Sequence, residues 1–370
     1  MLKSKKFFVP ALMTLALICA ALATAPGLAD GGQNHQRVNN NYGVSGGNIN
    51  NISKAFCCSG TLGSLVHDSF NNLYILSANH ILALSDQATP GDDISQPGLI
   101  DNNCQVPGIV ADFSTAVPLG NNVDAAIAAL RSGTMNTTGY IEDIGTICAT
   151  VRSPSVGLSV AKSGRTTGFT TAAVGSIDTN VKVQYQRGCG KGRKFTITYT
   201  NQVLVNSSSF SAGGDSGSLI VTNDVNHQPV ALLFAGSSSS TIGNPIGQVL
   251  SGLSSALGRT VSFVGGTCSP LAPAASGPTL TLQPYVYGQQ MPQLPDQATQ
   301  RAIQVLNQHR DELMVRSQIL GVGVGRSDEN DNEAAIIVYV DRTAAARPFV
   351  PDNLDGVKVR IELTDPFIAY

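Results

Sequence analysis

The stretch FSAGGDSGSLIV, residues 210–221, surrounds Ser216 with glycines and continues directly into an apolar run. Glycine allows left-handed backbone conformations and lets another group approach the main chain closely. The apolar run at 219–221 is typical of a buried strand. The stretch therefore predicts a turn before a strand. Two interpretations stay open: an ordinary Gly/Ser hairpin turn, or a turn that presents a hydroxyl and backbone N–H groups to a substrate.

Short apolar runs separated by turn residues extend on both sides of this stretch. Of the chain's residues, 42% are apolar and 13% are charged, so a large core can be buried. Runs of this length and spacing are typical of a β-sandwich or β-barrel. We predict strands at 61–66, 73–77, 125–130, 158–161, 173–177, 181–185, 195–199, 219–221 and 229–235. Apolar residues at helical spacing over 246–257 predict a helix that closes the β body.

The composition changes near residue 269. Residues 269–297 contain SPLAPAASGP and MPQLPDQ, which are typical of a proline-rich linker. Beyond it, 297–318 predicts an amphipathic helix, and ILGVGVG, AAIIVYV and VKVRIEL predict strands at 319–325, 334–340 and 357–363. We therefore expect a small α+β module at 298–370, a β domain at 55–268 and a poorly ordered Asn/Gly-rich arm at 30–54.

The N-terminus predicts export. Three lysines within the first six residues precede an apolar run at 7–23 and then small residues, which is typical of a signal peptide cleaved after residue 25 or 29. A membrane span is the alternative, but this run contains a proline and is short for one. We expect residues 1–29 to be removed, leaving a secreted or periplasmic protein without a stable membrane anchor.

Charge and cysteine content narrow the classes of partner. Loss of the three lysines changes the formal net charge from −2 to −5, which argues against nucleic acid as a partner. Six cysteines remain, and an even number in an exported protein predicts up to three disulfides in a pairing that the sequence leaves open. They are Cys57, Cys58, Cys104, Cys148, Cys189 and Cys268. No zinc-binding spacing is present, so we expect neither a metal nor another cofactor.

Acyl transfer by a serine needs a base, a carboxylate that orients the base, and N–H donors for the oxyanion. The N–H groups of Gly214 and Ser216 are placed to serve as these donors. Among five histidines, His80 in LYILSANHILAL directly follows a predicted strand. Its alternative is a core-edge histidine bonded to backbone. Asp124 in NNVDAAIAAL precedes an apolar run, and its alternative is a helix N-cap.

Three blocks, LSANH, VDAAIAAL and GGDSGSLI, resemble in order the active-site blocks of the chymotrypsin-like serine proteases. The resemblance covers residues 55–265, with 44 residues from His80 to Asp124 and 92 from Asp124 to Ser216. It implies a mainly β, double-barrel serine endopeptidase that cleaves protein or peptide substrates through an acyl-enzyme. It also implies that Ser216 is the nucleophile, His80 the general base, Asp124 its orienting acid, and Gly214 and Ser216 the oxyanion donors.

A narrower resemblance involves LYILSANHILAL, GDDISQPGLID and KSGRTTGFTTAAVGSI. These segments are similar to a bacterial trypsin-like subgroup related to the plant narrow-leaf proteins. Members of this subgroup often carry a GVGVG module like residues 319–325. In many of them the module precedes the protease domain, whereas here it follows.

The family resemblance also places a specificity pocket. Its base falls at Phe210 and its wall at Phe234, Ala235 and Gly236. None of these residues is charged, so we expect an uncharged, small or apolar side chain before the cleaved bond. The loop SGRTTGF around Arg165 has two interpretations, a basic recognition loop and a Gly/Thr hairpin of the second barrel.

The chain also departs from the family pattern. Ile81 stands where digestive members have a cysteine, and no IVGG-type activation terminus is present. Asp215 must therefore bind another group, or the chain needs a cleavage that the sequence does not locate. Two other functions remain open: a non-catalytic binding protein on a protease scaffold, and an esterase with the same triad. The sequence leaves the oligomeric state open.

Overall fold

The computed structural model describes residues 40–190, 192–270 and 293–369. All of them belong to one compact unit of the chain. The predicted signal peptide and residues 271–292 of the predicted linker lie outside the described residues. In the described part, no helix combines the length and the apolar character needed to cross a membrane.

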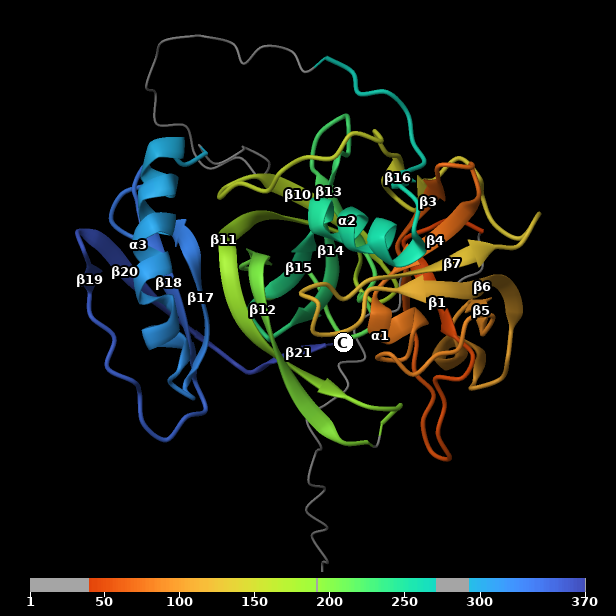
Figure 1. Ribbon diagram of the computed structural model, residues 1–370, viewed down its shortest axis with the longest axis horizontal. Helices are drawn as coiled ribbons and strands as arrows, with labels where there is room; N and C mark the ends of the chain where they lie inside the picture. Colours follow the sequence, from red (N-terminus) through yellow and green to blue (C-terminus); the bar gives the residue numbers. More distant parts are fainter. Residues whose placement is uncertain (1–39, 191, 271–292, 370) are drawn as a thin grey trace, which may run out of the picture. The chain divides into compact units, whose positions relative to one another are not determined.

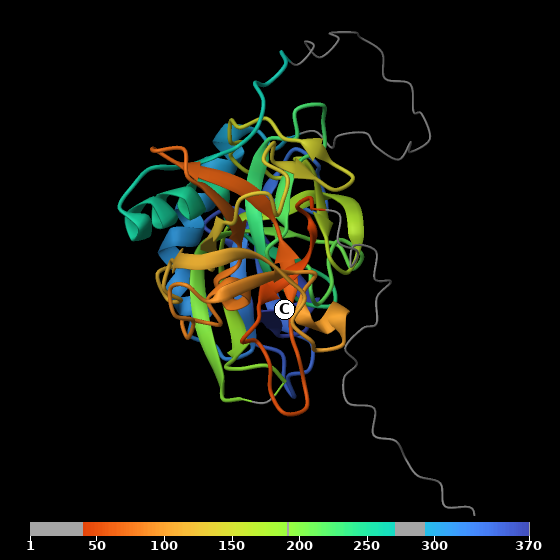
Figure 2. The same ribbon diagram turned by 90° about the vertical axis from the view of Figure 1, so that its right-hand side faces the viewer.

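Eight strands form the first sheet, in the order β16-β3-β4-β7-β6-β5-β1-β2, and every neighbouring pair is antiparallel. Figure 2 turns this sheet toward the viewer. Its inward side chains, including Leu65, Ile75 and Ile127, belong to one large buried cluster. The strands are β1 (Val44–Asn48), β2 (Gly60–Leu62), β3 (Ser64–Asp68), β4 (Leu73–Ser77), β5 (Asp93–Gln96), β6 (Gly108–Ala116), β7 (Ala126–Leu130) and β16 (Val261–Phe263).

Strand β1 lies within the segment that the sequence predicts to be a poorly ordered arm. All five of its residues are buried, because β2 pairs with one of its edges and β5 with the other. The expectation of poor order is therefore wrong for 44–48. The small residues that suggested disorder allow close packing instead, since a Cβ on Gly46 would lie 2.4 Å from the Leu62 side chain.

Six strands of the second sheet close into a barrel. They follow the order β10-β13-β14-β15-β12-β11, and β11 pairs back with β10. Figure 1 shows these strands, coloured from olive-yellow to teal, beside the first sheet. The strands are β10 (Ser159–Gly164), β11 (Gly168–Gln186), β12 (Lys194–Val205), β13 (Leu219–Thr222), β14 (Pro229–Gly236) and β15 (Thr241–Pro245).

Strand β11 joins two apolar runs that the sequence predicts as separate strands. The residues between them include Asp178, whose φ is +48°, and the pairing with β12 changes register between Ser176 and Val181. The polar interruption is therefore an irregularity inside one strand, of the kind that bends a strand without ending it. The first part of β11 pairs with β10, and the part after residue 173 pairs with β12 and β17.

Helix α2 (Ile246–Leu257) follows β15, where the sequence predicts a helix. It buries Ile246, Val249 and Leu253 and ends at Gly258, whose φ of +70° is the left-handed conformation common at helix ends. The remaining short elements of the β body are α1 (Asn79–Leu82), the 3₁₀ turn η1 (Leu99–Asn102), β8 (Tyr140–Ile141) and β9 (Gly145–Thr146).

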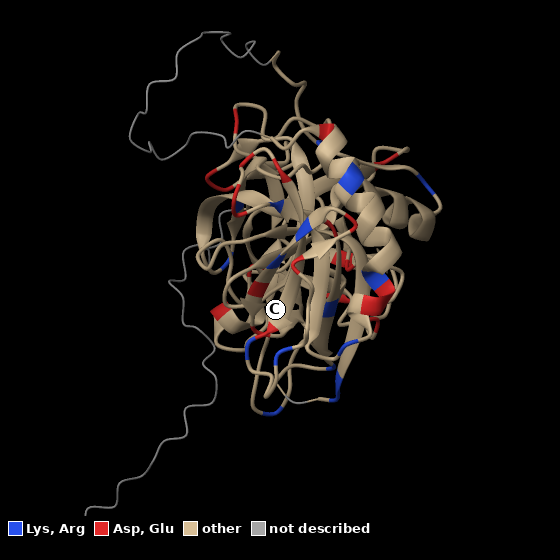
Figure 3. Cartoon of the chain, turned by 90° about the vertical axis from the view of Figure 1, so that its left-hand side faces the viewer, with Lys and Arg blue, Asp and Glu red and all other residues tan. Residues whose placement is uncertain are grey.

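The C-terminal module consists of one helix and five strands. They are α3 (Asp296–Met314), β17 (Ile319–Arg326), β18 (Ala334–Asp341), β19 (Asn353–Leu354), β20 (Val357–Thr364) and β21 (Phe367–Ala369). Helix α3 buries Val305, Leu306 and Leu313 against Val322 and Val338 of the strands. Acidic and basic positions lie close together on this module in Figure 3, and Arg360 pairs with Glu362 at 2.7 Å.

The module continues the second sheet. Strand β17 pairs antiparallel with β11, placing Val324 opposite Ile177. The Lys182 ammonium donates hydrogen bonds to the carbonyls of Met314, Arg316 and Ile319 at 2.8–3.0 Å, which ties β11 to the end of α3. The mainly β fold class is confirmed: an eight-stranded antiparallel sheet and a six-stranded barrel are followed by a small helix-and-strand module.

Candidate active site

His80 and Asp124 lie side by side where β4 ends and the neighbouring strand β7 begins. His80 lies in α1, directly after β4, and its Nδ1 is 2.7 Å from Oδ2 of Asp124. The His80 backbone N–H donates to the other carboxylate oxygen at 3.2 Å. Asp124 is completely buried and is followed by strand β7 rather than a helix, so it is not an N-cap. Its own N–H donates to Asn244 of β15 at 2.9 Å, which links it to the barrel.

A tyrosine pair completes the surroundings of this carboxylate. The Tyr185 hydroxyl donates to Oδ2 of Asp124 at 2.7 Å and lies 2.7 Å from the Tyr199 hydroxyl. Burial, reinforced by the charge of Asp124, raises the pKa of Tyr185 well above its ordinary value, so this phenol stays protonated. Because the Tyr185 hydroxyl donates its one proton to Asp124, it accepts the hydrogen bond that it shares with Tyr199, and Tyr199 is the donor. Sequence reasoning missed both tyrosines, since nothing local to β11 and β12 indicates that they reach Asp124.

Ser216 lies in the turn before β13, held between the two sheets. Its hydroxyl donates to the Phe234 carbonyl at 3.1 Å, and its own carbonyl accepts the N–H of Thr61 in β2 at 2.9 Å. The next N–H, from Gly217, donates to Leu233 of β14 at 2.8 Å. Ser216 is completely buried. The turn is therefore fixed to the barrel on one side and, on the other, to the sheet that carries His80.

The backbone before Ser216 requires glycine. Gly214 has a φ of +99°, and a Cβ there would lie 2.4 Å from the Thr166 hydroxyl. Its carbonyl accepts the Thr61 hydroxyl at 2.9 Å, which fixes the peptide orientation. Within the described ranges, neither the Gly214 N–H nor the Ser216 N–H has a hydrogen-bond acceptor. The left-handed backbone and the close approach of Thr166 therefore both require glycine at 214.

Asp215 is bound inside the barrel. It is completely buried and accepts hydrogen bonds from the backbone of Thr166, Thr167 and Ala212 at 2.8–3.2 Å. The equally buried Lys162 ammonium lies 3.4 Å from its Oδ2. Burial lowers the pKa of Lys162, and the charge of Asp215 opposes that shift. The turn thus has its cationic partner on β10 and needs none from a new N-terminus. Sequence reasoning missed this role of Lys162.

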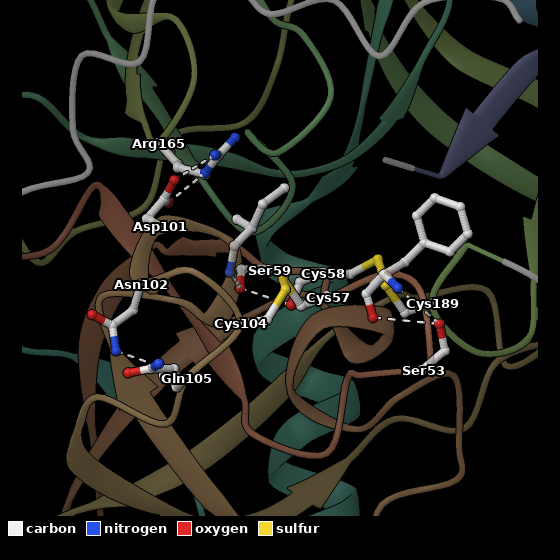
Figure 4. Close-up of a disulfide and its surroundings, with 12 residues drawn as sticks. Ser53, Cys57, Cys58, Ser59, Asp101, Asn102, Cys104, Gln105, Arg165 and Cys189 are labelled. Atoms are coloured by element: carbon white, nitrogen blue, oxygen red, sulfur yellow. Dashed lines mark hydrogen bonds and ion pairs between the residues drawn. A yellow bond between two sulfur atoms is a disulfide. The ribbon is translucent and has the colours of Figure 1, made fainter.

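Arg165 is a structural residue of the hairpin between β10 and β11. It is 7% exposed, and its guanidinium makes two hydrogen bonds to Asp101, at 2.7 and 2.6 Å. Figure 4 shows this bidentate pair together with the Cys57–Cys104 disulfide. The structure therefore supports the hairpin interpretation of SGRTTGF and does not support a recognition role for Arg165.

The residues predicted to form the specificity pocket separate into two groups. The side chains of Phe210 and Phe234 are completely buried, the first in the barrel core and the second against Tyr199 with ring centroids 4.9 Å apart. Ala235 and Gly236 end β14 and pair with β21. The predicted side-chain preference stays a prediction.

Three disulfides use all six cysteines expected after signal removal. They join Cys57 to Cys104, Cys58 to Cys189, and Cys148 to Cys268. Figure 4 shows the first two pairs side by side. The Cys58 pair connects the first sheet to the end of β11. Such bridges are typical of proteins that fold in an oxidising compartment.

Comparison with known proteins gives structural similarity only. No protein-family model matches the chain, and no curated protein matches its sequence. A glutamic-acid-specific serine protease structure aligns over 60% of this chain and 98% of its own, with 19% identity and a TM-score of 0.43.

Two further solved structures align over slightly less of the chain. Thermobifida fusca Protease A aligns over 56% of this chain and 92% of its own, with 18% identity and a TM-score of 0.38. Cellulomonas bogoriensis chymotrypsin aligns over 56% of this chain and 91% of its own, with 15% identity and a TM-score of 0.37. Because all three TM-scores are below 0.5, the fold assignment rests on the strand pairing of this chain.

Proposed function

We propose that this chain is an exported serine endopeptidase that acts through Ser216, His80 and Asp124. The observation that carries the proposal is the 2.7 Å contact between His80 Nδ1 and the buried Asp124. The Ser216 turn supports it, because its carbonyl bonds to Thr61 of the sheet that carries His80. The export signal at 1–29, the protease domain at 55–268 and the module at 298–370 belong to the same proposal, with β1 (Val44–Asn48) added to the protease domain. The substrate is a protein or peptide, and no cofactor takes part.

The geometry supports a defined division of roles. Asp124 accepts a hydrogen bond from the Nδ1–H of His80, which keeps that proton on Nδ1 and leaves Nε2 as the base for the Ser216 hydroxyl. That hydroxyl first turns away from the Phe234 carbonyl. Its oxygen bonds to the substrate carbonyl carbon, the proton passes to His80, and the N–H groups of Gly214 and Ser216 receive the oxyanion.

The C–N bond then breaks, and His80 returns its proton to the leaving amine, which produces the acyl-enzyme. Water repeats the sequence: His80 removes a proton as the oxygen attacks the ester carbon, and the Ser216 oxygen leaves with that proton. Each of the two half-reactions therefore ends with His80 in the neutral form in which it began.

Hydrolysis of a protein substrate tests this proposal. Mature chain incubated with casein at high enzyme concentration should release peptides, and Ser216→Ala and His80→Ala should each lower the rate about 10⁴-fold or more. Cleavage of an amide bond also separates an endopeptidase from an esterase. Equal release by wild type and Ser216→Ala would refute the proposed chemistry.

A further inference from the structure

The last described strand is inserted between two strands of the barrel region. Strand β21 pairs antiparallel with β14, with Ala369 opposite Ala235 and Ile368 opposite Gly236. Its other edge pairs parallel with β11, with Phe367 opposite Val183. We call the space between Val183–Gln184 of β11 and Ala235–Gly236 of β14 the β11–β14 slot. In Figure 1, β21 leaves the C-terminal module and runs into the barrel region.

On both strands that form the slot, the adjacent residue contacts the candidate active site. On β14, Ala235 follows Phe234, whose carbonyl accepts the Ser216 hydroxyl at 3.1 Å. On β11, the paired residues precede Tyr185, whose hydroxyl donates to Asp124 at 2.7 Å. Because the register with β14 is antiparallel, β21 runs along β14 toward Phe234. Its path therefore points at the nucleophile.

Backbone pairing and one aromatic side chain hold β21 in place. Phe367 is completely buried, with its ring centroid 5.9 Å from that of Tyr339. Ile368, in contrast, is 47% exposed. Just before the strand, the Thr364 hydroxyl lies 2.7 Å from that of Ser237 in the loop after β14. A ligand held this way is recognised by its extended backbone and by one large apolar side chain.

We propose that the β11–β14 slot is a binding site for an extended peptide beside Ser216, and that β21 fills this site in cis. The site takes a segment that pairs antiparallel with β14 and has an aromatic residue at the position of Phe367. The assignment of the bound peptide as substrate rests on the proposed function; the binding site itself does not. Ser216 is completely buried in this structure. A peptide that takes the same place between β11 and β14 must displace β21.

Because β21 is part of the same chain, it competes strongly with a free peptide for the β11–β14 slot. A segment on the same chain competes at an effective concentration of about millimolar for a short flexible connection. A peptide supplied in solution at micromolar concentration therefore binds weakly to the full chain. Removal of β21 leaves the same walls open, and the same peptide then binds without competition.

Direct binding measures the competition without relying on catalysis. A fluorescein-labelled peptide ELTDPFIA, which repeats residues 362–369, is titrated by anisotropy against Ser216→Ala chains so that no cleavage occurs. We expect the chain lacking 366–370 to bind at least about tenfold more tightly than the full chain. Equal affinity of the two chains, or no binding to a truncated chain that circular dichroism shows to be folded, would overturn the proposal.

Single substitutions in the full chain give an independent answer if truncation disturbs folding. Ile368→Pro removes an N–H from a strand paired on both edges, which such a strand does not tolerate. Ile368→Ala keeps the backbone donor and changes an exposed side chain only. We expect Ile368→Pro to bind the peptide like the truncated chain and Ile368→Ala to bind it like the full chain. Equal affinity of these two variants would also overturn the proposal.

Casein hydrolysis with Ser216 intact separates the two proposals. Faster hydrolysis by the truncated chain than by the full chain supports both the cis-filled site and the protease function. Tight peptide binding with no hydrolysis by either chain keeps the binding site and removes the proposed function. Equal hydrolysis by both chains keeps the protease function and removes the cis-filled site.

Discussion

At the scale of single residues, Tyr185 is the strongest addition to the site. Its hydroxyl is a buried, permanently protonated donor to the carboxylate that orients His80. A hydrogen bond to a charged group contributes about 1.5–3 kcal/mol. Tyr185→Phe should therefore lower kcat/KM about tenfold or more, with the chain still folded. Tyr199→Phe, one hydrogen bond further from the carboxylate, should have a smaller effect. Equal or reversed effects would contradict this role of the Tyr185–Asp124 hydrogen bond.

Lys162 provides a second residue-scale prediction. Lys162→Met leaves the carboxylate of Asp215 buried without its cation, which costs about 3–5 kcal/mol. Urea unfolding should show this loss as a lower midpoint. Adding Asp215→Asn to Lys162→Met removes the uncompensated charge and should recover much of the stability. A double variant as unstable as Lys162→Met alone would argue against the ion pair.

At the scale of elements, the β3–β4 hairpin depends on one buried carboxylate. Burial raises the pKa of Asp68, but hydrogen bonds from Asn72, Phe70 and Tyr74 together outweigh burial and hold that pKa well below its usual range. Arg259 also donates to it at 2.6 Å. A carboxylate whose pKa is lower in the folded than in the unfolded chain stabilises the fold at pH values above its unfolded pKa. That contribution is lost as the pH falls from the unfolded pKa toward the folded one.

Acid unfolding tests this account of Asp68. Because the unfolded pKa is about 4, wild type should lose stability steeply as the pH falls below that value. Asp68→Asn should be less stable than wild type at neutral pH and should show a flatter pH dependence between about pH 4 and 2. The free energy of unfolding measured by urea at each pH checks both statements. Parallel curves for the two chains would contradict them.

Local sequence patterns predicted most elements but not their partners. The run at 246–257 forms α2, and the three apolar runs after residue 318 form β17, β18 and β20, because their periodicity records which face is buried. Strand β1 escaped prediction because its burial comes from pairing with β2 and β5 rather than from its own side chains. Strand β21 was also missed, because three residues are too few to show a periodicity and its place depends on pairing with β11 and β14.

The candidate site was foreseeable to a similar extent. Ordered motifs suggested His80, Asp124 and Ser216, and in the structure His80 Nδ1 lies 2.7 Å from Asp124 Oδ2. Lys162 and Tyr185 lie on strands whose local sequence shows only that they are strands. Their contacts with Asp215 and Asp124 depend on barrel closure, which places residues distant in the sequence beside one another.

At the scale of the whole molecule, the Cys58–Cys189 disulfide connects the first sheet to the end of β11. It encloses a separation of 131 residues, against 47 for the Cys57–Cys104 pair. Replacing Cys58 and Cys189 together by alanine should cost about 2–5 kcal/mol, because the unfolded chain gains freedom. Thermal unfolding under non-reducing conditions measures this loss. An unchanged Tm would show that hydrogen bonds and packing alone hold the two parts together.

Covalent labelling of the chain lacking residues 366–370 tests the catalytic assignment most directly. A fluorophosphonate forms a bond between phosphorus and an activated serine oxygen as fluoride leaves, and peptide mapping by mass spectrometry locates the adduct. We predict one adduct per chain, on Ser216, with labelling greatly slowed in His80→Ala. An adduct on another residue, or a rate unaffected by His80→Ala, would contradict the assignment of these two side chains as nucleophile and base.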